Sequence, residues 1–369
     1  MTFREAFEGA LLSILKTGAL FELAILSVVF YAFYYPLPYA HQVSENIPMV
    51  VVDEDRTGLS ATLVQRLGDT RAVEITGVVP DFATARRAVR AGEADGILYL
   101  SPDFSQAALY GRPDTGVAVW VNGAYLVRAE SISEALTGVV EDTVMERLQA
   151  RTPSFRTVSD PIVVQPLFNT TSGYLNYIFP AIVNIILQQT LLFTSARLII
   201  GRLNARPSMS AAEALGTWAG CTTLGIFAAC FYFGFVFWFQ DVPRAGNMPA
   251  LLIAVPLFAM AVAALGLLVG TFFRSGEDVL KLLMPTSVPL VFLAGFAWPL
   301  YQMPDWLATL VWLSPATVGM HLFVRLNQMG ATLQEVAGPL LVGAGLALGY
   351  GSLFLWRMSR IRREAGRAG

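Results

Sequence analysis

Residues 17–39, TGALFELAILSVVFYAFYYPLPY, decide the fold of this chain. The run is apolar and about as long as the ~20 residues that cross the hydrocarbon core of a bilayer. A polar stretch at 40–173 follows it, and the chain then returns to apolar segments almost without pause. We therefore predict a membrane α-helical protein with one large water-exposed domain inserted after its first helix.

The composition supports a membrane protein and argues against several other classes. Of the 369 residues, 55% are hydrophobic and only 14% are charged, which is too apolar for an ordinary soluble protein. The net charge is −2 and no basic stripe alternates with aromatic residues, so we predict no nucleic-acid partner. The two histidines, His41 and His321, have no partners at ligand spacing, so no metal site is predicted.

Six apolar segments have uncharged centres, as insertion requires when one central charge costs ~2.5–3.5 kcal/mol. We predict transmembrane helices at 17–39, 174–200, 214–240, 249–273, 282–300 and 336–357. The 201–213 loop, the 274–281 loop and the 358–369 tail then share one side and carry most of the basic residues of the short loops. By the positive-inside rule both termini are cytoplasmic, and the 40–173 domain lies outside a bacterial inner (plasma) membrane.

The segment at 306–324 is also apolar, but counting it as a span would move the basic tail to the other side. Pro315 interrupts it and Pro304 marks a fresh helix start. We therefore predict a re-entrant helical pair at 304–329, between the fifth and sixth helices and shielded by its neighbours. Residues 1–16 alternate apolar and charged positions, which predicts an amphipathic helix on the inner membrane surface.

Strand and helix patterns alternate within the outer domain, which predicts a small α/β layer with a mostly parallel sheet. Strands are expected at 47–52, 72–79, 96–100, 117–121 and 158–164, and helices at 57–67, 83–91 and 125–149. Asp53-Glu54-Asp55 follows the first strand and admits two interpretations. It is either a metal site of a glycosyltransferase or, as we favour without a second acidic cluster nearby, a turn that caps the next helix.

Three groups of residues, in the same order along the chain, resemble ABC-2-type ABC exporter permeases. They are Tyr35 to Tyr39 with Ile47 to Asp55; Pro166 to Asn169 with Tyr174 and Pro180; and Gly295 to Pro299 with Met303 to Leu307, Ser314, Pro315 and Arg325. The resemblance implies a transmembrane subunit that pairs with a second copy or paralogue and is driven by cytoplasmic ABC ATPase subunits. It also implies an outer gate at the re-entrant pair, formed by Pro299, Pro304, Trp306, Pro315 and Arg325.

The sequence around the lysines also indicates that a separate chain carries the ATPase site. A phosphate-binding loop needs glycines before a Lys-Ser/Thr pair. Leu15 precedes Lys16, Leu282 follows Lys281, and the sequence has no other lysine. We therefore predict no enzyme activity and no cofactor on this chain, with ATP and Mg²⁺ bound by the partner.

Polar residues inside the spans are the candidate site residues, because they are costly there. Asn184, Gln188 and Ser195 share one face of the second helix, and Glu22 lies in the first. The three residues predict either a substrate path at the interface between two halves or interhelical hydrogen bonds worth ~0.6–2 kcal/mol each. For Glu22, contact with the inner headgroups is favoured over a role in the path.

The inside segments are the candidate contacts for an ATPase. We name Arg202, Arg206 and Glu213 near the 201–213 loop, and Glu277, Asp278 and Lys281 in the 274–281 loop; the alternative is that these are solvated charged loops. The predicted function is export of an amphipathic or apolar compound such as a drug or lipid, with membrane lipid and a periplasmic adaptor as further partners. The alternative is a membrane-anchored binding or scaffold protein whose outer domain captures a partner.

Overall fold

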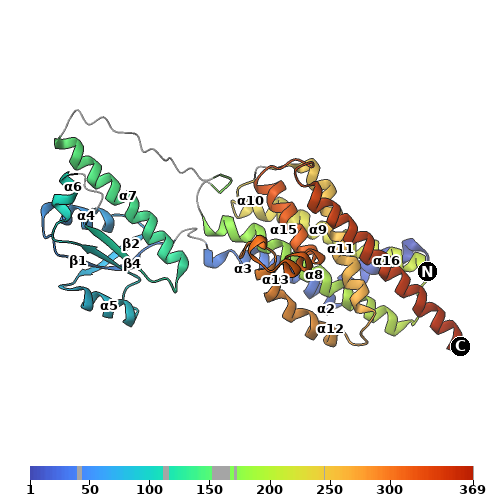
Figure 1. Ribbon diagram of the computed structural model, residues 1–369. Helices are drawn as coiled ribbons and strands as arrows, with labels where there is room; N and C mark the ends of the chain where they lie inside the picture. The colour runs from blue at the N-terminus through green and yellow to red at the C-terminus, as the bar shows by residue number, and fades with distance from the viewer. Residues whose placement is uncertain (40–43, 111–115, 152–166, 170–172, 245, 369) are drawn as a thin grey trace. The chain divides into compact units, whose positions relative to one another are not determined.

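The computed structural model describes residues 1–39, 44–110, 116–151, 167–169, 173–244 and 246–368. The chain divides into two compact units, one made of Met1–Ala40 and Pro166–Gly369 and the other of His41–Gln165 (Figure 1). The strand predicted at 158–164 lies outside the described residues.

The inserted unit is built on a four-stranded sheet in the order β2-β1-β3-β4. Its strands are β1 (Ile47–Asp53), β2 (Val73–Val78), β3 (Gly96–Leu100) and β4 (Val117–Val121). β1 pairs in parallel with β2 and β3, whereas β4 runs antiparallel to β3, with Gly96 opposite Val121. The α/β prediction is confirmed, and the sheet is mixed because of its β4 edge.

Alternating residues of β1 face two layers of helices, as the two-residue period of a strand requires. Met49 and Val51 join the core under α4 (Gly58–Gly68), α6 (Phe104–Tyr110) and α7 (Leu126–Arg151). Val50 and Val52 face α5 (Phe82–Ala91) on the opposite side (Figure 1). The sheet is therefore buried between two helical layers.

The Asp53-Glu54-Asp55 segment has the geometry of a capped turn. Asp53 Oδ1 accepts the backbone N–H groups of Asp55 (3.1 Å) and Arg56 (2.9 Å), and its Oδ2 accepts the Ser60 hydroxyl (2.8 Å). Thr57 caps α4 by accepting the Ser60 N–H at 3.3 Å. Within the described residues no group of three or more His, Cys, Asp or Glu side chains is arranged to hold a metal ion.

The second unit is a helical bundle with membrane character. Among the described residues, five helices are long and apolar enough to cross a membrane, or six if a bent pair counts as one span. The five are Gly18–Tyr39 (α2 Gly18–Phe21, a π-helical turn Glu22–Leu26, α3 Ser27–Tyr34 and a 3-10 turn Leu37–Tyr39), Tyr174–Ala205 (α8), Ala211–Phe239 (α9 Ala211–Cys230, a π-helical turn Phe231–Val236 and α10 Phe237–Phe239), Pro249–Gly270 within α11 (Met248–Gly270), and Ala337–Gly366 within α16 (Ala337–Ala368).

The helix predicted at 282–300 is displaced toward the N-terminus. It comprises α12 (Gly276–Leu283), a 3-10 turn (Met284–Thr286) and α13 (Ser287–Leu293). Ser275 caps its start by accepting the Glu277 N–H at 3.1 Å. The helix therefore begins before the charged residues Glu277 and Asp278 and includes them in its first turn. Gly295, with a φ of 95°, turns the chain soon after the helix ends.

The predicted pair of short helices is confirmed. α14 (Asp305–Leu310) with the 3-10 turn Val311–Leu313 meets α15 (Pro315–Phe323), continued by the π-helical turn Val324–Gln328, at an angle of 89°. Ser314 is extended, with a ψ of 121°, because a residue that precedes proline is disfavoured in the helical region.

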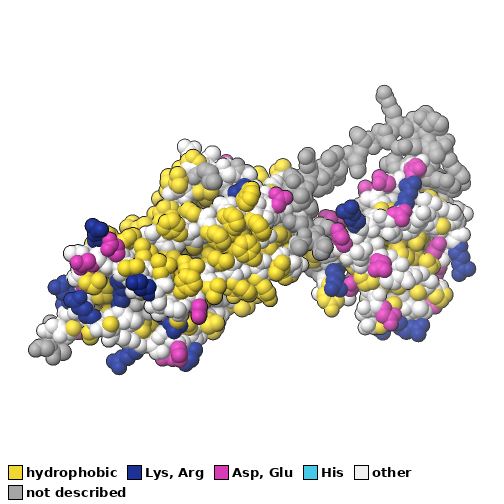
Figure 2. Space-filling model, turned by 180° about the vertical axis from the view of Figure 1, so that it is seen from behind, with side chains coloured by type: hydrophobic (Ala, Val, Ile, Leu, Met, Phe, Trp, Pro, Cys, Tyr) yellow, Lys and Arg dark blue, Asp and Glu magenta, His cyan; other side chains and the backbone are white. Residues whose placement is uncertain are grey.

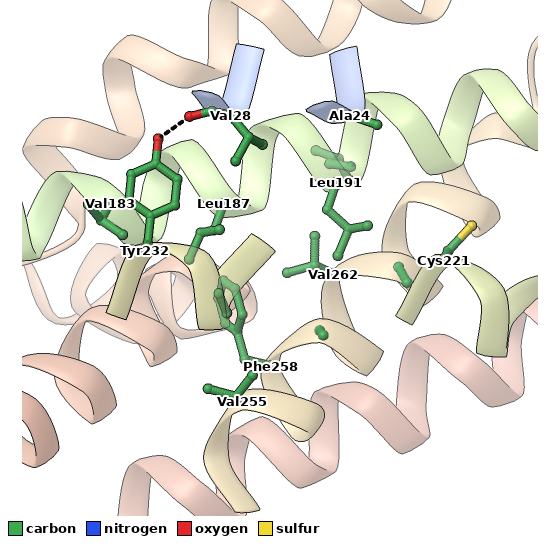
Figure 3. Close-up of a cluster of buried hydrophobic side chains, with 14 of the residues drawn as sticks. Ala24, Val28, Val183, Leu187, Leu191, Cys221, Tyr232, Val255, Phe258 and Val262 are labelled. Atoms are coloured by element: carbon green, nitrogen blue, oxygen red, sulfur yellow. Dashed lines mark hydrogen bonds between the residues drawn. The ribbon is translucent and has the colours of Figure 1, made fainter. Parts of the chain in front are cut away.

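α8 forms the centre of the bundle, since 83% of its span is buried, against 22% for α16. Val183, Leu187 and Leu191 of α8 pack among side chains of the first span, α9, its π-helical continuation and α11 (Figure 3). In the same core the Tyr232 hydroxyl donates to the Val28 carbonyl at 2.8 Å.

Both termini lie at one end of the bundle (Figure 1). The amphipathic helix α1 (Phe3–Lys16) packs on α9 at this end, where a Cβ on Gly216 would lie 2.3 Å from the Phe3 carbonyl oxygen. Tyr39 and Tyr174, which flank the inserted unit in sequence, lie with ring centroids 5.2 Å apart. Hydrophobic side chains cover the middle of the bundle, and Arg, Lys, Asp and Glu gather at its end (Figure 2).

Candidate functional site

A groove runs along the bundle between the first span, α8 and the α12–α13 helix. Its volume is ≈ 490 Å³, which suits a small amphipathic molecule. Most of its lining is aliphatic or aromatic, and the polar groups are Ser27, Gln189, Thr190 and Ser287, with the hydroxyls of Tyr31 and Tyr35.

One stripe of α8 forms a wall of this groove. The lining residues of the helix are Ile182, Ile185, Ile186, Gln189, Thr190 and Phe193. These positions repeat at intervals of three and four residues, which places them on a single helical face. The polar members of the stripe, Gln189 and Thr190, follow Gln188 in the sequence and lie beside the face that the sequence analysis singles out.

Gln189 links the two walls of the groove. Its Nε2 donates to the Ser287 hydroxyl at 2.6 Å and to the Thr286 hydroxyl at 3.2 Å, which joins α8 to the start of α13. Its Oε1 is buried and has no hydrogen-bond partner among the described residues. A buried acceptor without a donor is unfavourable, so this oxygen favours a ligand or water that can donate to it.

Asn184, Gln188 and Ser195 point into the bundle instead of the groove. Asn184 is fully buried and its Nδ2 donates to the Pro180 carbonyl at 2.8 Å. Ser195 is also fully buried and packs on α11, where a Cβ on Gly266 would lie 2.9 Å from the Ser195 Cβ. The Asn184 bond therefore stays within α8, and Ser195 contributes to helix packing without a hydrogen bond among the described residues.

Gln188 connects α8 to the bent pair. Its Oε1 accepts the backbone N–H of Ala316 at 2.6 Å and the Ser314 hydroxyl at 3.2 Å. Pro315 breaks the helix at this point, so the N–H of Ala316 would otherwise lack a partner. Gln188 therefore provides an acceptor for the buried backbone N–H that the break leaves without a helical partner.

Glu22 lies beside the groove, not in its lining. Its side chain is exposed and forms no ion pair with another described residue. Glu22 opens the π-helical turn, where its carbonyl accepts the Ser27 hydroxyl at 2.8 Å. Turns of this kind are frequent at functional sites, and this one presents Ser27 to the groove.

The residues predicted to couple to an ATPase gather at the end of the bundle that holds both termini. Arg202 donates to the Thr217 hydroxyl of α9 and to the Ala6 carbonyl of α1, the latter at 3.1 Å. Glu213 is only 3% exposed, and its Oε1 lies 3.1 Å from Arg206 Nη1 and 3.2 Å from the Met1 amino group. Arg202, Arg206 and Glu213 thus join α1, α8 and α9 into one block.

The second predicted group is more exposed. Glu277 and Asp278 lie in the first turn of α12, where negative charge complements the helix dipole. Asp278 pairs with Lys281 at 3.1 Å, and both side chains are more than half exposed. The loop reaches the end of α8, because Asn204 Nδ2 donates to the Arg274 carbonyl at 2.9 Å.

The predicted gate residues surround the bent pair without forming one cluster of contacts. Pro299 and Pro304 precede short helical turns, Pro315 is buried at the 89° break, and Arg325 Nη1 donates to the Glu335 carbonyl at 3.4 Å. Trp306 is 68% exposed and follows two other exposed aromatic residues, Trp298 and Tyr301. Such aromatic residues are typical of a membrane–water interface.

A model of the family described as "ABC-2 family transporter protein" matches residues 18–356, which include the groove, the insert and the bent pair. The chain belongs to this family. It is the transmembrane permease subunit of an ABC transporter, a multi-pass membrane protein without an ATPase domain. The resemblance to ABC-2-type permeases is confirmed.

Among curated proteins, the permease is similar to "Probable multidrug ABC transporter permease YbhR" of Escherichia coli K12. The two are 20% identical over 311 residues, which cover 82% of this chain and 83% of the relative. The protein of the same name from Escherichia coli O157:H7 matches to the same extent. ABC permeases pair with ATPase subunits, so the permease works with a separate energy source.

From the sequence, Gln189 and Thr190 lie beside the polar face of Asn184 and Gln188, but the groove side of α8 could not be told apart from its buried side. The signal was present in the spacing of Ile182, Ile185, Ile186, Gln189 and Phe193. It was hidden because α8 is buried over 83% of its span and carries polar residues on more than one side, so its pattern does not mark one face.

Proposed function

We propose that this permease is the membrane half of an ATP-driven exporter of amphipathic or apolar compounds, and that the groove receives the substrate. The observation that carries the proposal is the lining of the groove. Its aliphatic and aromatic walls suit the apolar part of a substrate, and Gln189, Thr190 and Ser287 supply a few polar groups for orientation. The multidrug designation of the relative YbhR agrees with such a substrate class.

Energy would come from cytoplasmic ATPase subunits that bind ATP and Mg²⁺. A movement of the ATPase subunits would be transmitted to the block of α1, α8 and α9, because Arg202 hydrogen-bonds to both α1 and α9. A displacement of the 201–213 loop would then reach α8, whose side chains line the groove. In this proposal two permease halves pair and both termini are cytoplasmic.

The outer gate would respond to the same motion. Gln188 lies on α8 next to the groove residue Gln189 and holds the break of the bent pair through Ala316. A shift of α8 would therefore move α15 and the residues Pro299, Pro304, Trp306, Pro315 and Arg325 around it. The inserted α/β domain would lie outside the cytoplasm and hand substrate onward, with a periplasmic adaptor as a candidate partner.

Filling the groove tests this function. We expect Ile186→Trp to reduce ATP-dependent efflux of a fluorescent amphiphile at least tenfold in vesicles that contain the permease and its ATPase, because the indole occupies space that the substrate needs. Leu341→Trp is the matched control, since Leu341 is 73% exposed on α16 and lies outside the groove. Wild-type efflux by a well-folded Ile186→Trp variant would contradict the proposal.

A further inference from the structure

A second cavity lies at the end of the bundle that holds the termini. Its volume is ≈ 550 Å³. Three parts of the chain enclose it: the junction of α1 and α2, the end of α8 and the start of α12. The polar and charged residues that line it are Ser13, Thr17, Arg197, Arg202, Asn204, Ser275 and Glu277.

The two arginines of this cavity have no carboxylate partner among the described residues. Arg202 donates only to the Thr217 hydroxyl and the Ala6 carbonyl, which are neutral. Arg197 is half-buried, and no hydrogen bond or ion pair of its guanidinium occurs within the described part of the chain. Nearby Arg206, by contrast, is paired with Glu213 at 3.1 Å. A partly buried charge without a partner is unfavourable, so the cavity favours an anion.

Arg197 is held in place by its packing. A Cβ on Gly276 would lie 3.0 Å from the Arg197 Cγ and 3.2 Å from its Nε, so the arginine stem lies closely against the first residue of α12. This contact limits the rotamers of the side chain that lines the cavity. A guanidinium that is positioned in advance loses less entropy when it binds a phosphate group through two parallel hydrogen bonds.

The balance of charge indicates which kind of phosphate fits. Arg197 and Arg202 are the cations of the lining and Glu277 is its acid, so the described lining carries one net positive charge. A phosphodiester carries a single negative charge, whereas free inorganic phosphate is more highly charged near neutral pH. The Thr17 side chain caps no backbone group, which leaves its hydroxyl free to donate to such a ligand.

Apolar surface adjoins the cavity on its α1–α2 side. Leu15 is 57% exposed and Phe21 is 39% exposed, and they flank the lining residues Thr17 and Leu20 in sequence. An acyl chain can cover such surface while its head group reaches the arginines. We propose that this cavity binds the phosphodiester head group of an anionic membrane lipid, which would hold α1–α2, α8 and α12 together. The proposal does not rest on the transported substrate.

Native mass spectrometry of the purified full-length chain, titrated with phosphatidylglycerol, tests the site. We expect one lipid per chain to bind most tightly and Arg197→Gln to weaken that binding on the order of tenfold, because a hydrogen-bonded charge is lost. Glu277→Gln should strengthen it severalfold, since it removes the acid of the lining. Arg4→Gln, which removes an 85% exposed charge of α1 outside the cavity, should leave the binding unchanged.

Three results would overturn the proposal. One is an Arg197→Gln variant, with an unchanged thermal midpoint, that binds phosphatidylglycerol like the wild type. Another is full displacement of the lipid by millimolar inorganic phosphate, which would assign the cavity to a soluble anion. The third is loss of ATPase association in Arg197→Gln with lipid binding unchanged, which would assign it to a protein contact. If Arg197→Gln fails to fold, the test rests on Glu277→Gln. A phosphatidylglycerol affinity of Glu277→Gln equal to that of the wild type would then contradict the proposal.

Discussion

Gln188 shows how one polar side chain inside an apolar bundle can serve the backbone of another element. It is 3% exposed and accepts the Ala316 N–H at 2.6 Å, directly after the proline that breaks the bent pair. The donor is buried, so losing its acceptor has the full penalty of an unpaired polar group. At this scale the polar residues of α8 separate into two roles, with Gln188 structural and Gln189 facing the groove.

Removing the acceptor of Gln188 should weaken the fold. We expect Gln188→Leu to destabilise the permease by about 1–3 kcal/mol, because the Ala316 N–H loses its partner. The thermal midpoint in detergent measures this loss. Gln302→Leu is the control, since Gln302 is exposed in a short turn and should show little change. Equal midpoints for Gln188→Leu and the wild type would show that the bond contributes nothing.

At the scale of the element, small residues allow α1 to pack closely against α9. Gly216 and Gly220 lie one turn apart on α9, and Cβ atoms there would come within 2.3 Å of the Phe3 carbonyl oxygen and 2.8 Å of the Ala10 Cβ. Ala6, Ala10 and Ile14 form the matching buried stripe of α1. Close approach of this kind lets Arg202 reach the Ala6 carbonyl, so the packing and the polar contact depend on each other.

A methyl group at Gly216 should therefore release α1. We expect Gly216→Ala to lower the thermal midpoint and expose α1 to protease, because the added Cβ overlaps a backbone atom that cannot move alone. Gly201→Ala is the matched control: a Cβ there meets nothing within 4 Å, and alanine is favoured over glycine in a helix by about 1 kcal/mol. A Gly216→Ala protein as resistant to protease as Gly201→Ala would refute the close packing.

The whole molecule is arranged so that both ends of the chain meet at one end of the bundle. Met1 contacts Glu213, and Arg362 and Arg363 of α16 line a cavity with Met209 and Ala211, beside the same loop. An even number of crossings would produce this arrangement. The five apolar helices supply five, and we propose the α12–α13 helix, which is not itself one of the helices long and apolar enough to cross, as the sixth. We propose that this end is cytoplasmic, as the positive-inside rule predicts.

Cysteine labelling tests that orientation. In a chain whose Cys221 and Cys230 are replaced by alanine, we expect Glu93→Cys in the insert to react with a membrane-impermeant maleimide on intact spheroplasts, because Glu93 is exposed and the insert is proposed to lie outside the cytoplasm. Ala365→Cys in α16 should react only after the membrane is opened. Labelling of both positions on intact spheroplasts would contradict six crossings and the proposed export.

The local sequence alone was enough to predict the membrane class, the insert after the first span and the break at Pro315. These features follow from local properties: apolar length, β-branched runs bounded by turns, and the restriction that proline imposes. The α/β nature of the insert was predictable for the same reason, because short apolar runs such as Ile47 to Val52 alternate with helical patterns along the chain. Which helical layer each side chain of the run faces became clear only in the structure.

Only the tertiary structure decided which side of α8 faces the groove and which groups share a cavity. A helix that is buried nearly all round shows no clear amphipathic pattern, so Gln188 and Gln189 could not be assigned to different neighbours until Ala316 and Ser287 were placed beside them. The ion pair between Glu213 and the Met1 amino group and the lack of a described partner for Arg197 depend equally on contacts between distant segments. Local sequence sets what each segment forms, and packing sets what its side chains meet.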